Sequence, residues 1–559
     1  MSSALAAASL ILKPEGYSEG TLESLKPIDR SGDFTFTRGS NLSATRVNSA
    51  GLIEKGRENL FKYSNQFDNA IWQGYAVWSS GQVDKDGGTS AWTFAKNNAS
   101  ASDFYNDTTT NGVQTFSIYA KKQIGVGLKP YFFGSSNGYA TFNLEDGSVY
   151  STNGSIIIDT NVETYNSLWW RISVTINGSS GNWYLYVTDG TDTQTTDVIT
   201  LQDAQLEAGM VATDYIETGA STVKAGILEN TPRLDYSGGA TEPSLLLEPQ
   251  RSNLMNHSEY FGDAAWNTAT SRSYNLTYTD ELNPMGLAGS YKYESTDTDN
   301  QLANVNYSAV AGTAYTNSIY VKRVSGTGDV RLRDVNNTGT DFSLSAADGW
   351  KRIDVTATAS GTTGRLYLNL DDTGDEILVW GAQQEVGSYP TSYIPTYGSS
   401  ETRSAEENTT ANISSVIGQN EGTFFLDFEY TGFELGEAYN WIALESENGH
   451  ERVLIYKNAN STDLLVYLSA NNSMVMVKSI EAIASNTRYK LAFKYSNGDQ
   501  AIYLNGSQEH TSTHSYTRGS DLSRLTFNES NNPASCKVHQ CIVFESGLTD
   551  SGLATLTTL

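Results

Sequence analysis

Two similar stretches decide the fold of this chain: NLFKYSNQFDNAIW at residues 59–72 and NLMNHSEYFGDAAW at residues 253–266. They share the pattern N-L-x3-S-x2-F-x2-A-x-W without a gap. Three more pairs of blocks follow in the same order: SIYAKK (117–122) with SIYVKR (318–323), WWRISVT (169–175) with WKRIDVT (350–356), and AQLEAGMVATDYIET (204–218) with AQQEVGSYPTSYIPT (382–396). A repeat period of about 190 residues is too long for a solenoid, so the sequence predicts two copies of one whole domain.

Each copy is predicted to consist of β-strands. Segments such as FSIYAKK, WRISVTI and WYLYVTD alternate in polarity or run apolar over five to seven residues. Clusters rich in Gly, Asn, Asp and Ser separate them, for example NGSSGN at 177–182 and NNTGTD at 336–341. Short strands separated by turns, without long helical segments, predict a β-sandwich or jelly roll.

The last part of the chain, from about residue 416, predicts a different sandwich. GTFFLDFEY opens it with an alternating pattern, and RYKLAFKYSNGDQAIYLNGSQ predicts a hairpin. Asn497-Gly498 is a favoured two-residue hairpin turn. The ending LTDSGLATLTTL predicts a short helix, with Thr549 or Asp550 as its N-cap.

Composition and charge limit the classes of function. The chain has 559 residues, which predicts about three to five domains, and a formal net charge of −27, which disfavours binding to nucleic acid. No apolar stretch reaches the length of about 18 residues that a membrane span needs, so we expect no membrane insertion. The opening MSSALAAASLILKPEG has its first basic residue, Lys13, only after the apolar run, so we expect no export signal.

The two cysteines, Cys536 and Cys541, lie in the strand-like run CKVHQCIVF. Their separation of five residues would place them on opposite faces of a regular strand. We therefore predict buried free thiols rather than a disulfide.

Several segments carry a resemblance to a known family. FTFTRGSNLSATRVNSAGLIE, PRLDY, LLLEPQRSNL and the N-L-x3-S-x2-F-x2-A-x-W pattern together resemble tailed-phage virion proteins. In that family such segments precede carbohydrate-binding-module-like jelly rolls in head fibres, tail fibres and auxiliary capsid proteins. The third domain resembles concanavalin A-like (laminin G-like) sandwiches through YKLAFKYSNGDQAIYLNG and CIVFESGLTDSGLATLTTL. Here PRLDY and LLLEP lie between the two jelly rolls rather than before the first, which indicates that a duplication split the usual order.

The resemblance implies an all-β chain of two homologous jelly rolls and a concanavalin A-like sandwich, preceded by an extended N-terminal attachment segment. The expected division is a virion-attachment segment at 1–58, jelly rolls at 59–222 and 253–397 with an extended connector at 223–252 between them, a linker at 398–415, and the concanavalin A-like domain at 416–559.

The function that the resemblance implies is that of a non-enzymatic structural component of a phage particle, assembled in the host cytoplasm and exposed on the particle surface. It would be a head fibre, tail fibre or capsid decoration protein. Its expected partners are other virion proteins (capsid, portal or tail), bound through the N-terminal segment, further copies of itself in a trimer, and cell-surface glycans. Two alternatives stay open: a secreted bacterial carbohydrate-binding adhesin and a glycan depolymerase.

No catalytic residue is predicted. Gly16-Tyr17-Ser18-Glu19-Gly20 matches the G-x-S-x-G nucleophile pattern, but nothing predicts the α/β sheet that this motif requires. Asp427 and Glu429 share a strand face, as acid pairs do in concanavalin-like glucanases. Those enzymes have an E-x-D-x-E arrangement, and this chain has Phe425 at the position of its first acid.

One acidic turn is a candidate cation site. Asp371, Asp372, Asp375 and Glu376 offer the hard oxygen ligands that calcium prefers. A structural calcium is the functional interpretation, a plain acidic turn is the alternative, and no other cofactor is expected.

Comparison of the two copies sorts the tryptophans. Trp72 matches Trp266, and Trp169 matches Trp350, so these four are predicted to be core residues. Trp170 aligns with Lys351 and would point away from the core. Trp170 and Trp183 are the predicted glycan or interface residues, because exposed aromatic side chains often mark contact surfaces.

Overall fold

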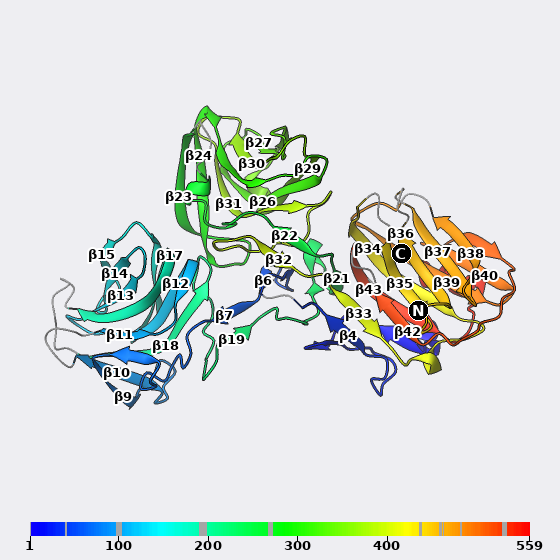
Figure 1. Cartoon of the computed structure of the whole chain (residues 1–559), viewed down its shortest axis with the longest axis horizontal. Coiled ribbons are helices and arrows are strands. Elements are labelled where there is room, and N and C mark those ends of the chain that lie inside the picture. The colour runs from blue at the N-terminus through cyan, green and yellow to red at the C-terminus, as the bar shows by residue number, and fades with distance from the viewer. Residues whose placement is uncertain are drawn as a thin grey trace.

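The computed structural model describes residues 2–39, 42–96, 103–188, 198–266, 272–434, 439–457, 461, 463–480, 483–527 and 534–559. It contains three β-sandwich lobes joined by a region of short strands, and both chain termini lie in the third lobe (Figure 1). The sheets are antiparallel throughout the described pairings. Among the described residues, no helix has the length and apolar character to cross a membrane.

The first sandwich contains strands β8 to β18. Their bounds are β8 (Trp72–Gly74), β9 (Ala76–Gln82), β10 (Ala91–Lys96), β11 (Asp103–Asn106), β12 (Thr110–Lys121), β13 (Gly127–Phe133), β14 (Gly138–Asn143), β15 (Val149–Asn153), β16 (Ile157–Asn166), β17 (Trp169–Thr188) and β18 (Val198–Ala208). The first half of β17 pairs with β12 and β16, and its second half pairs with β13 and β11. One long strand therefore belongs to both sheets.

A glycine-containing corner lets β17 change sheets. The strand turns between Gly178 and Gly181, with Ser180 at a φ of 48°. A Cβ at Gly181 would lie 2.5 Å from the ring of Phe132, so the corner has no space for a side chain there. Strands that switch sheets commonly do so at such bends.

The second sandwich has the same two-sheet design. One sheet has the order β23-β24-β31-β26-β29, and the other has the order β25-β30-β27-β28. The bounds are β23 (Arg272–Leu282), β24 (Ala288–Asn300), β25 (Leu302–Ser308), β26 (Ala314–Ser325), β27 (Val330–Arg333), β28 (Gly339–Phe342), β29 (Lys351–Thr358), β30 (Thr363–Leu370) and β31 (Glu376–Val386).

The repeated sequence blocks form the same hydrogen-bonded lock in both copies. In the first copy, the buried Asn59 amide donates to the carbonyls of Ala204 and Ile216 at 3.1 and 2.8 Å. In the second copy, Asn253 donates to the matching carbonyls of Ala382 and Ile394 at the same two distances. The repeat thus ties the opening and closing segments of each sandwich together.

A second pair of equivalent contacts closes each copy. The Thr213 backbone and hydroxyl donate to buried Glu207 at 2.8 and 2.6 Å, and Thr391 donates in the same way to buried Glu385 at 2.9 and 2.7 Å. Buried carboxylates need such donors, which explains why these polar positions repeat with the apolar ones.

The third sandwich includes the N-terminus of the chain. Its sheets have the orders β20-β21-β43-β34-β39-β40-β41, with β1 also on β43, and β2-β3-β4-β33-β42-β35-β36-β37-β38. The bounds are β1 (Leu10–Leu12), β2 (Tyr17–Ser18), β3 (Thr21–Leu22), β4 (Phe34–Thr37), β20 (Leu234–Asp235), β21 (Ser244–Leu247), β33 (Glu407–Thr410), β34 (Thr423–Gly432), β35 (Tyr439–Glu445), β36 (Arg452–Lys457), β37 (Leu464–Ala470), β38 (Ser473–Ile480), β39 (Thr487–Ser496), β40 (Asp499–Leu504), β41 (Ser507–Ser512), β42 (Arg524–Phe527) and β43 (Ser535–Phe544).

The prediction of an extended N-terminal segment is therefore wrong for residues 2–37. Leu10 and Leu12 pair with β43 at the other end of the chain and are fully buried in the core of the third sandwich. The apolar run at residues 10–12 forms a buried strand because its side chains complete that core. The helices α1 (Ser2–Ala7) and α2 (Asp550–Thr557) cover the other face of the same sheet, and Thr549 is the N-cap of α2, as predicted.

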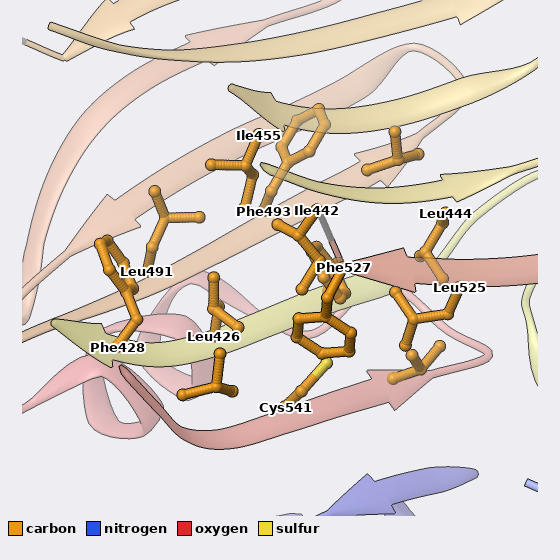
Figure 2. Close-up of a cluster of buried hydrophobic side chains, with 14 of the residues drawn as sticks. Leu426, Phe428, Ile442, Leu444, Ile455, Leu491, Phe493, Leu525, Phe527 and Cys541 are labelled. Atoms are coloured by element: carbon orange, nitrogen blue, oxygen red, sulfur yellow. The ribbon is translucent and has the colours of Figure 1, made fainter. Parts of the chain in front are cut away.

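Both cysteines point into the core of the third sandwich, which corrects the prediction that they lie on opposite strand faces. Cys541 lies among the labelled core side chains in Figure 2, and Cys536 belongs to the same cluster. The reason is a register shift: Gln540 pairs with Asp427 but Val538 pairs with Phe428, so one extra residue bulges from β43. A bulge reverses the alternation of faces beyond it. Both side chains are buried, and the two cysteines do not form a disulfide with each other.

Three segments between the lobes form what we call the junction: residues 38–58, 223–252 and 398–410. Its strands are β5 (Thr45–Val47), β6 (Ile53–Lys55), β7 (Arg57–Asn59), β19 (Val223–Ala225), β22 (Arg251–Asn253) and β32 (Glu401–Arg403), which pair as β5-β6, β7-β19 and β22-β32. Strands β21 and β33 enter the sheets of the third sandwich. The predicted connector and linker are thus structured parts of the molecule, because their strands pair with other parts of the chain and their buried charged residues form ion pairs between the segments.

A buried cluster of five charged side chains joins the three junction segments. Arg38 comes from the first, Arg233 and Glu248 from the second, and Arg403 and Glu406 from the third, and each is at most 3% exposed. Arg233 binds both Glu406 oxygens at 2.5 Å and Glu248 at 2.8 Å. Arg403 binds Glu248 at 2.9 Å, and Arg38 binds Glu406 at 3.3 Å. Because an isolated buried charge is very costly, each segment holds the other two in place.

We expect Arg233→Met to lower the free energy of unfolding by about 3–5 kcal/mol, because the change leaves Glu248 and Glu406 short of a buried partner. Calorimetry and guanidinium unfolding would measure the loss. Lys224→Met is the matched control, since the Lys224–Glu229 pair is exposed at the surface and separated by 3.4 Å. Equal stability of the two variants would contradict the structural role of the cluster.

The cluster also predicts loss of stability in acid. Burial favours the neutral form of Glu248, but Arg403, Arg233 and the Ser392 hydrogen bonds hold its pKa at about 2, below the ordinary 4.5. A carboxyl group with a lowered folded-state pKa stabilises the fold above pH 4.5 and loses that contribution as the pH falls toward 2, at about 1.4 kcal/mol per pKa unit. Glu248→Gln should be less stable at pH 7 and should lose less stability between pH 5 and pH 3 than the parent chain. Identical pH slopes would show that Glu248 does not titrate in this way.

Candidate functional site

The first sandwich carries a row of aromatic side chains on the outer face of one sheet. In β17, Trp183 and Leu185 point into the core, so the alternating Tyr184 and Tyr186 lie on the opposite, outer face. Strand β13 follows the same rule, with Phe132 inside and Tyr131 on the outer face. The sheet order places β11, β17, β13 and β14 side by side.

Strand register brings four tyrosines into one line across these strands. Tyr105 pairs with Tyr184, Tyr184 pairs with Tyr131, and Tyr131 pairs with Tyr139. The Tyr105 and Tyr184 rings stack with centroids 4.5 Å apart, and the Tyr131 and Tyr139 rings stack at 5.7 Å. Directly opposed cross-strand aromatic pairs stabilise a sheet and form a continuous surface.

The row is widened by three further side chains, Phe133, Tyr186 and Lys129. The Phe133 ring is 56% exposed and packs edge-on against Tyr184 at 6.0 Å. Lys129 places its ammonium 4.0 Å from the centre of the Tyr139 ring. We call the following six side chains the aromatic face: Tyr105, Tyr131, Phe133, Tyr139, Tyr184 and Tyr186.

The aromatic face has the chemistry of a contact surface for amphipathic ligands. Its tyrosines are half-buried, so each offers an apolar ring and a hydroxyl to the solvent side. Exposed groups of aromatic residues generally mark interaction sites rather than core packing. A sugar ring, with apolar C–H faces and hydroxyl edges, matches such a surface.

Strands β27 and β30, on the equivalent sheet of the second sandwich, have a different outer face. There the outward positions of β27 and β30 hold Arg331, Arg333, Tyr367 and Asn369. Arg331 forms a bidentate pair with Asp341 at 2.5 and 2.9 Å, and Arg333 donates to Asn369 at 2.8 Å. The two copies thus share a closing lock but differ on this outer face, which is charged in one and aromatic in the other.

The structure separates the two predicted tryptophan candidates. Trp183 is 1% exposed and stacks on Phe116 at 5.1 Å, so the prediction that it contacts a glycan or partner is wrong. Trp170 is half-buried, donates to the Leu144 carbonyl at 3.0 Å and lies under the Lys122 ammonium at 3.8 Å. Its role at an interface stays a prediction.

The predicted core tryptophans differ among themselves. Trp72, Trp169 and Trp266 are buried, as expected. Trp350 is only half-buried, and its indole N–H donates to the Leu282 carbonyl at 2.9 Å.

The four acids of the predicted calcium turn do not converge. Buried Asp375 pairs with Arg323 at 2.8 Å, and Glu376 pairs with Lys292 at 3.1 Å. In the described part of the chain, one acidic group has ligand atoms within 4.8 Å of one another: Asp329, Asp341 and Asp371. It includes only Asp371 of the predicted four, and the neighbouring Arg331 is paired to two of its members, Asp341 at 2.5 Å and Asp371 at 3.7 Å. The predicted arrangement of Asp371, Asp372, Asp375 and Glu376 as one site is therefore wrong.

Asp427 has its carboxylate held by a neighbouring cation. Both of its oxygens accept hydrogen bonds from Arg488, at 2.7 and 2.8 Å. Phe425, at the position of the missing acid, packs with Ile542 and Leu553 in the small core beneath α2. These contacts give both side chains a structural role.

In comparisons with known proteins, parts of this chain are similar in fold to parts of solved structures. No protein-family model and no curated protein matches the sequence. Domain 4 of AbnA, a GH43 extracellular arabinanase from Geobacillus stearothermophilus solved with arabinotriose, is 13% identical, with a TM-score of 0.23 over 28% of this chain and 73% of that one. The CBM40 of Ruminococcus gnavus IT-sialidase, bound to α2,3 sialyllactose, is 12% identical, with a TM-score of 0.23 over 27% and 91%. Bacillus licheniformis β-glucanase is 12% identical, with a TM-score of 0.20 over 25% and 72%.

Part of the aromatic face follows from the sequence alone. The alternation W-Y-L-Y at 183–186 places Tyr184 and Tyr186 opposite the core face as soon as Trp183 is assigned to the core. Strand order and register, which align Tyr105 and Tyr139 with them, depend on pairing between distant segments.

Proposed function

We propose that this chain is a non-enzymatic structural component of a phage particle surface that adsorbs to glycans through the aromatic face of its first sandwich. The aromatic face is the observation that carries the proposal. Its line of four cross-strand tyrosines, extended by the exposed Phe133, offers stacking surfaces along the outer face of a sheet. A row of rings along a sheet face suits weak binding to extended saccharides.

Weak single contacts are consistent with a multivalent particle component. When several copies are held together, each further contact forms at a high effective concentration, so avidity exceeds the affinity of one site. We propose a trimer, by analogy with phage fibres, as the unit that presents these faces.

The buried charge cluster supports the structural part of the proposal. Arg38, Arg233 and Arg403 come from three distant segments and meet on two carboxylates, so the lobes are joined by packed, paired structure rather than by free linkers. A carrier of this kind would hold the aromatic face at a defined distance from its attachment point.

The phage assignment is supported by the sequence segments that build the junction. These segments, FTFTRGSNLSATRVN, PRLDY and LLLEPQRS, contribute β4, β5, β20, β21 and three of the five buried charges, Arg38, Arg233 and Glu248. We propose that the lobe containing both termini docks on the particle. Ile28 and Leu25, which are 90% and 49% exposed on the loop between β3 and β4, offer apolar contacts for capsid, portal or tail proteins.

Removal of two rings should weaken glycan adsorption. On a glycan array, the double variant Phe133→Ala/Tyr139→Ala of the full chain should lose signal by about tenfold or more, equivalent to about 1.4 kcal/mol, because two stacking surfaces disappear. The matched control is Tyr165→Ala, an aromatic residue 44% exposed on the other sheet of the same sandwich. Absence of binding by the multivalent parent chain, or equal losses in both variants, would contradict glycan adsorption through this face.

The particle assignment has a separate test. Mass spectrometry and cryo-EM of purified phage particles from a producing culture should find this chain at a fixed copy number on the particle exterior. Its presence in the culture medium or on the cell envelope, with none on the particles, would favour the secreted-adhesin alternative.

A further inference from the structure

A cleft of about 360 Å³ lies in the junction, where the first sandwich, the end of the second sandwich and the segment around β6 and β7 meet. Its lining includes Leu60 and Asn111 from the first copy, Tyr397 from the end of the second copy, and Lys55 from the junction. The volume falls within the range of about 300–1,000 Å³ typical of small-molecule sites, and such sites often lie between domains.

The cleft is lined by charged side chains of both signs. Three cations line it, Lys55, Arg57 and Lys224, together with two carboxylates, Glu58 and Glu401. Two of the cations have carboxylate partners just outside the lining: Arg57 lies 3.7 Å from Asp214, and Lys224 lies 3.4 Å from Glu229. Lys55 is thus the lining cation to which the described residues bring no carboxylate within ion-pairing distance, and such a cation favours an anionic ligand over a neutral or cationic one.

Lys55 is the central feature of the cleft. Its side chain is 9% exposed, and its ammonium donates to the Tyr397 hydroxyl oxygen and lies 4.4 Å from the centre of that ring. Within the described ranges, no carboxylate forms an ion pair with Lys55. An ammonium has three donor hydrogens, so it keeps capacity for an acceptor in the cleft.

A hydrogen bond to buried Glu259 fixes the position of the Tyr397 side chain. Its hydroxyl donates to buried Glu259 at 2.9 Å, and Tyr393 donates to the same carboxylate oxygen at 3.0 Å. Burial, together with the neighbouring Glu259, raises the pKa of Tyr397, which keeps the phenol protonated. The Tyr397 oxygen thus accepts from Lys55 while its proton points to Glu259, and this arrangement orients the ammonium.

We propose that this cleft binds the carboxylate of an acidic monosaccharide unit, with Lys55 as its principal partner and Arg57 as the second cation. The remaining lining suits a sugar ring: Leu60 and the Tyr397 ring supply apolar surface, while the Asn111 amide and the Glu58 carboxylate supply a donor and an acceptor for hydroxyl groups. A buried cation without an ion-paired carboxylate gains most from a ligand that brings one.

The inference goes beyond the proposed function, because the cleft and the aromatic face share no residue. Calorimetric titration of the full chain with D-glucuronate is the direct test, with D-glucose and inorganic sulfate as control ligands. Glucuronate should bind, and Lys55→Met should weaken that binding by about tenfold or more. Lys55→Arg, which keeps the charge, should bind within about threefold of the parent, and Lys292→Met, which removes a lysine from the second sandwich, should bind as the parent does.

Circular dichroism would establish that each variant is folded, and Lys55→Gln, which also removes the charge, replaces Lys55→Met if that variant is unfolded. Equal binding of glucose and glucuronate would overturn the proposal, as would sulfate binding as tight as that of glucuronate. Parent-like binding by Lys55→Met, or an equal loss in Lys55→Arg and Lys55→Met, would overturn the role of the Lys55 charge. None of these results bears on adsorption by the aromatic face, which is measured with polymeric glycans and different variants.

Discussion

The architecture depends on one buried arrangement of charges. Arg233 lies between Glu248 and Glu406, and Arg38 and Arg403 complete the set from two other segments of the chain. Charges that are removed from water must find partners with good geometry, so the three segments can be buried only together. This requirement turns what would otherwise be linkers into a structured junction. The same segments line the cleft around Lys55, so the charge cluster also fixes the position of that lining.

The duplication shows which parts of a sandwich are constrained and which are free to change. The closing locks of Asn59 and Asn253 have the same partners and distances, because a buried amide or carboxylate leaves few solutions for its hydrogen bonds. The outer sheet faces carry no such requirement, since water satisfies whatever polar groups stand there. One copy has therefore become aromatic, around Tyr184, and the other charged, around Arg331. The surface proposed for glycan adsorption is accordingly one of these outer faces, where the copies differ.

The third sandwich illustrates how distant parts of a chain complete one core. Strand β1 lies beside β43, so the first and last strands of the protein are neighbours (Figure 1). The apolar run LIL at 10–12 has a single bridge to a nearby segment, between Ile11 and Lys26, and its leucines are buried against the core that forms at the other end of the chain. Three non-consecutive segments contribute strands to this one lobe, in addition to residues 416–559.

The sequence by itself determined the features that depend on local pattern and on repetition. These are the all-β class, the duplicated sandwich, the buried Trp72 and Trp266, and the terminal helix, whose N-cap Thr549 is one of the two predicted residues. Alternation with a period of two assigns strand faces, and a matched repeat marks shared core positions. Only the tertiary structure decided the rest: the bulge at β43 that turns both cysteines inward, the pairing of Tyr105 with Tyr184, and the meeting of Arg38 with Glu406. Each of these depends on the register or approach of segments far apart in the chain, and side-chain spacing along one segment carries no information about that approach.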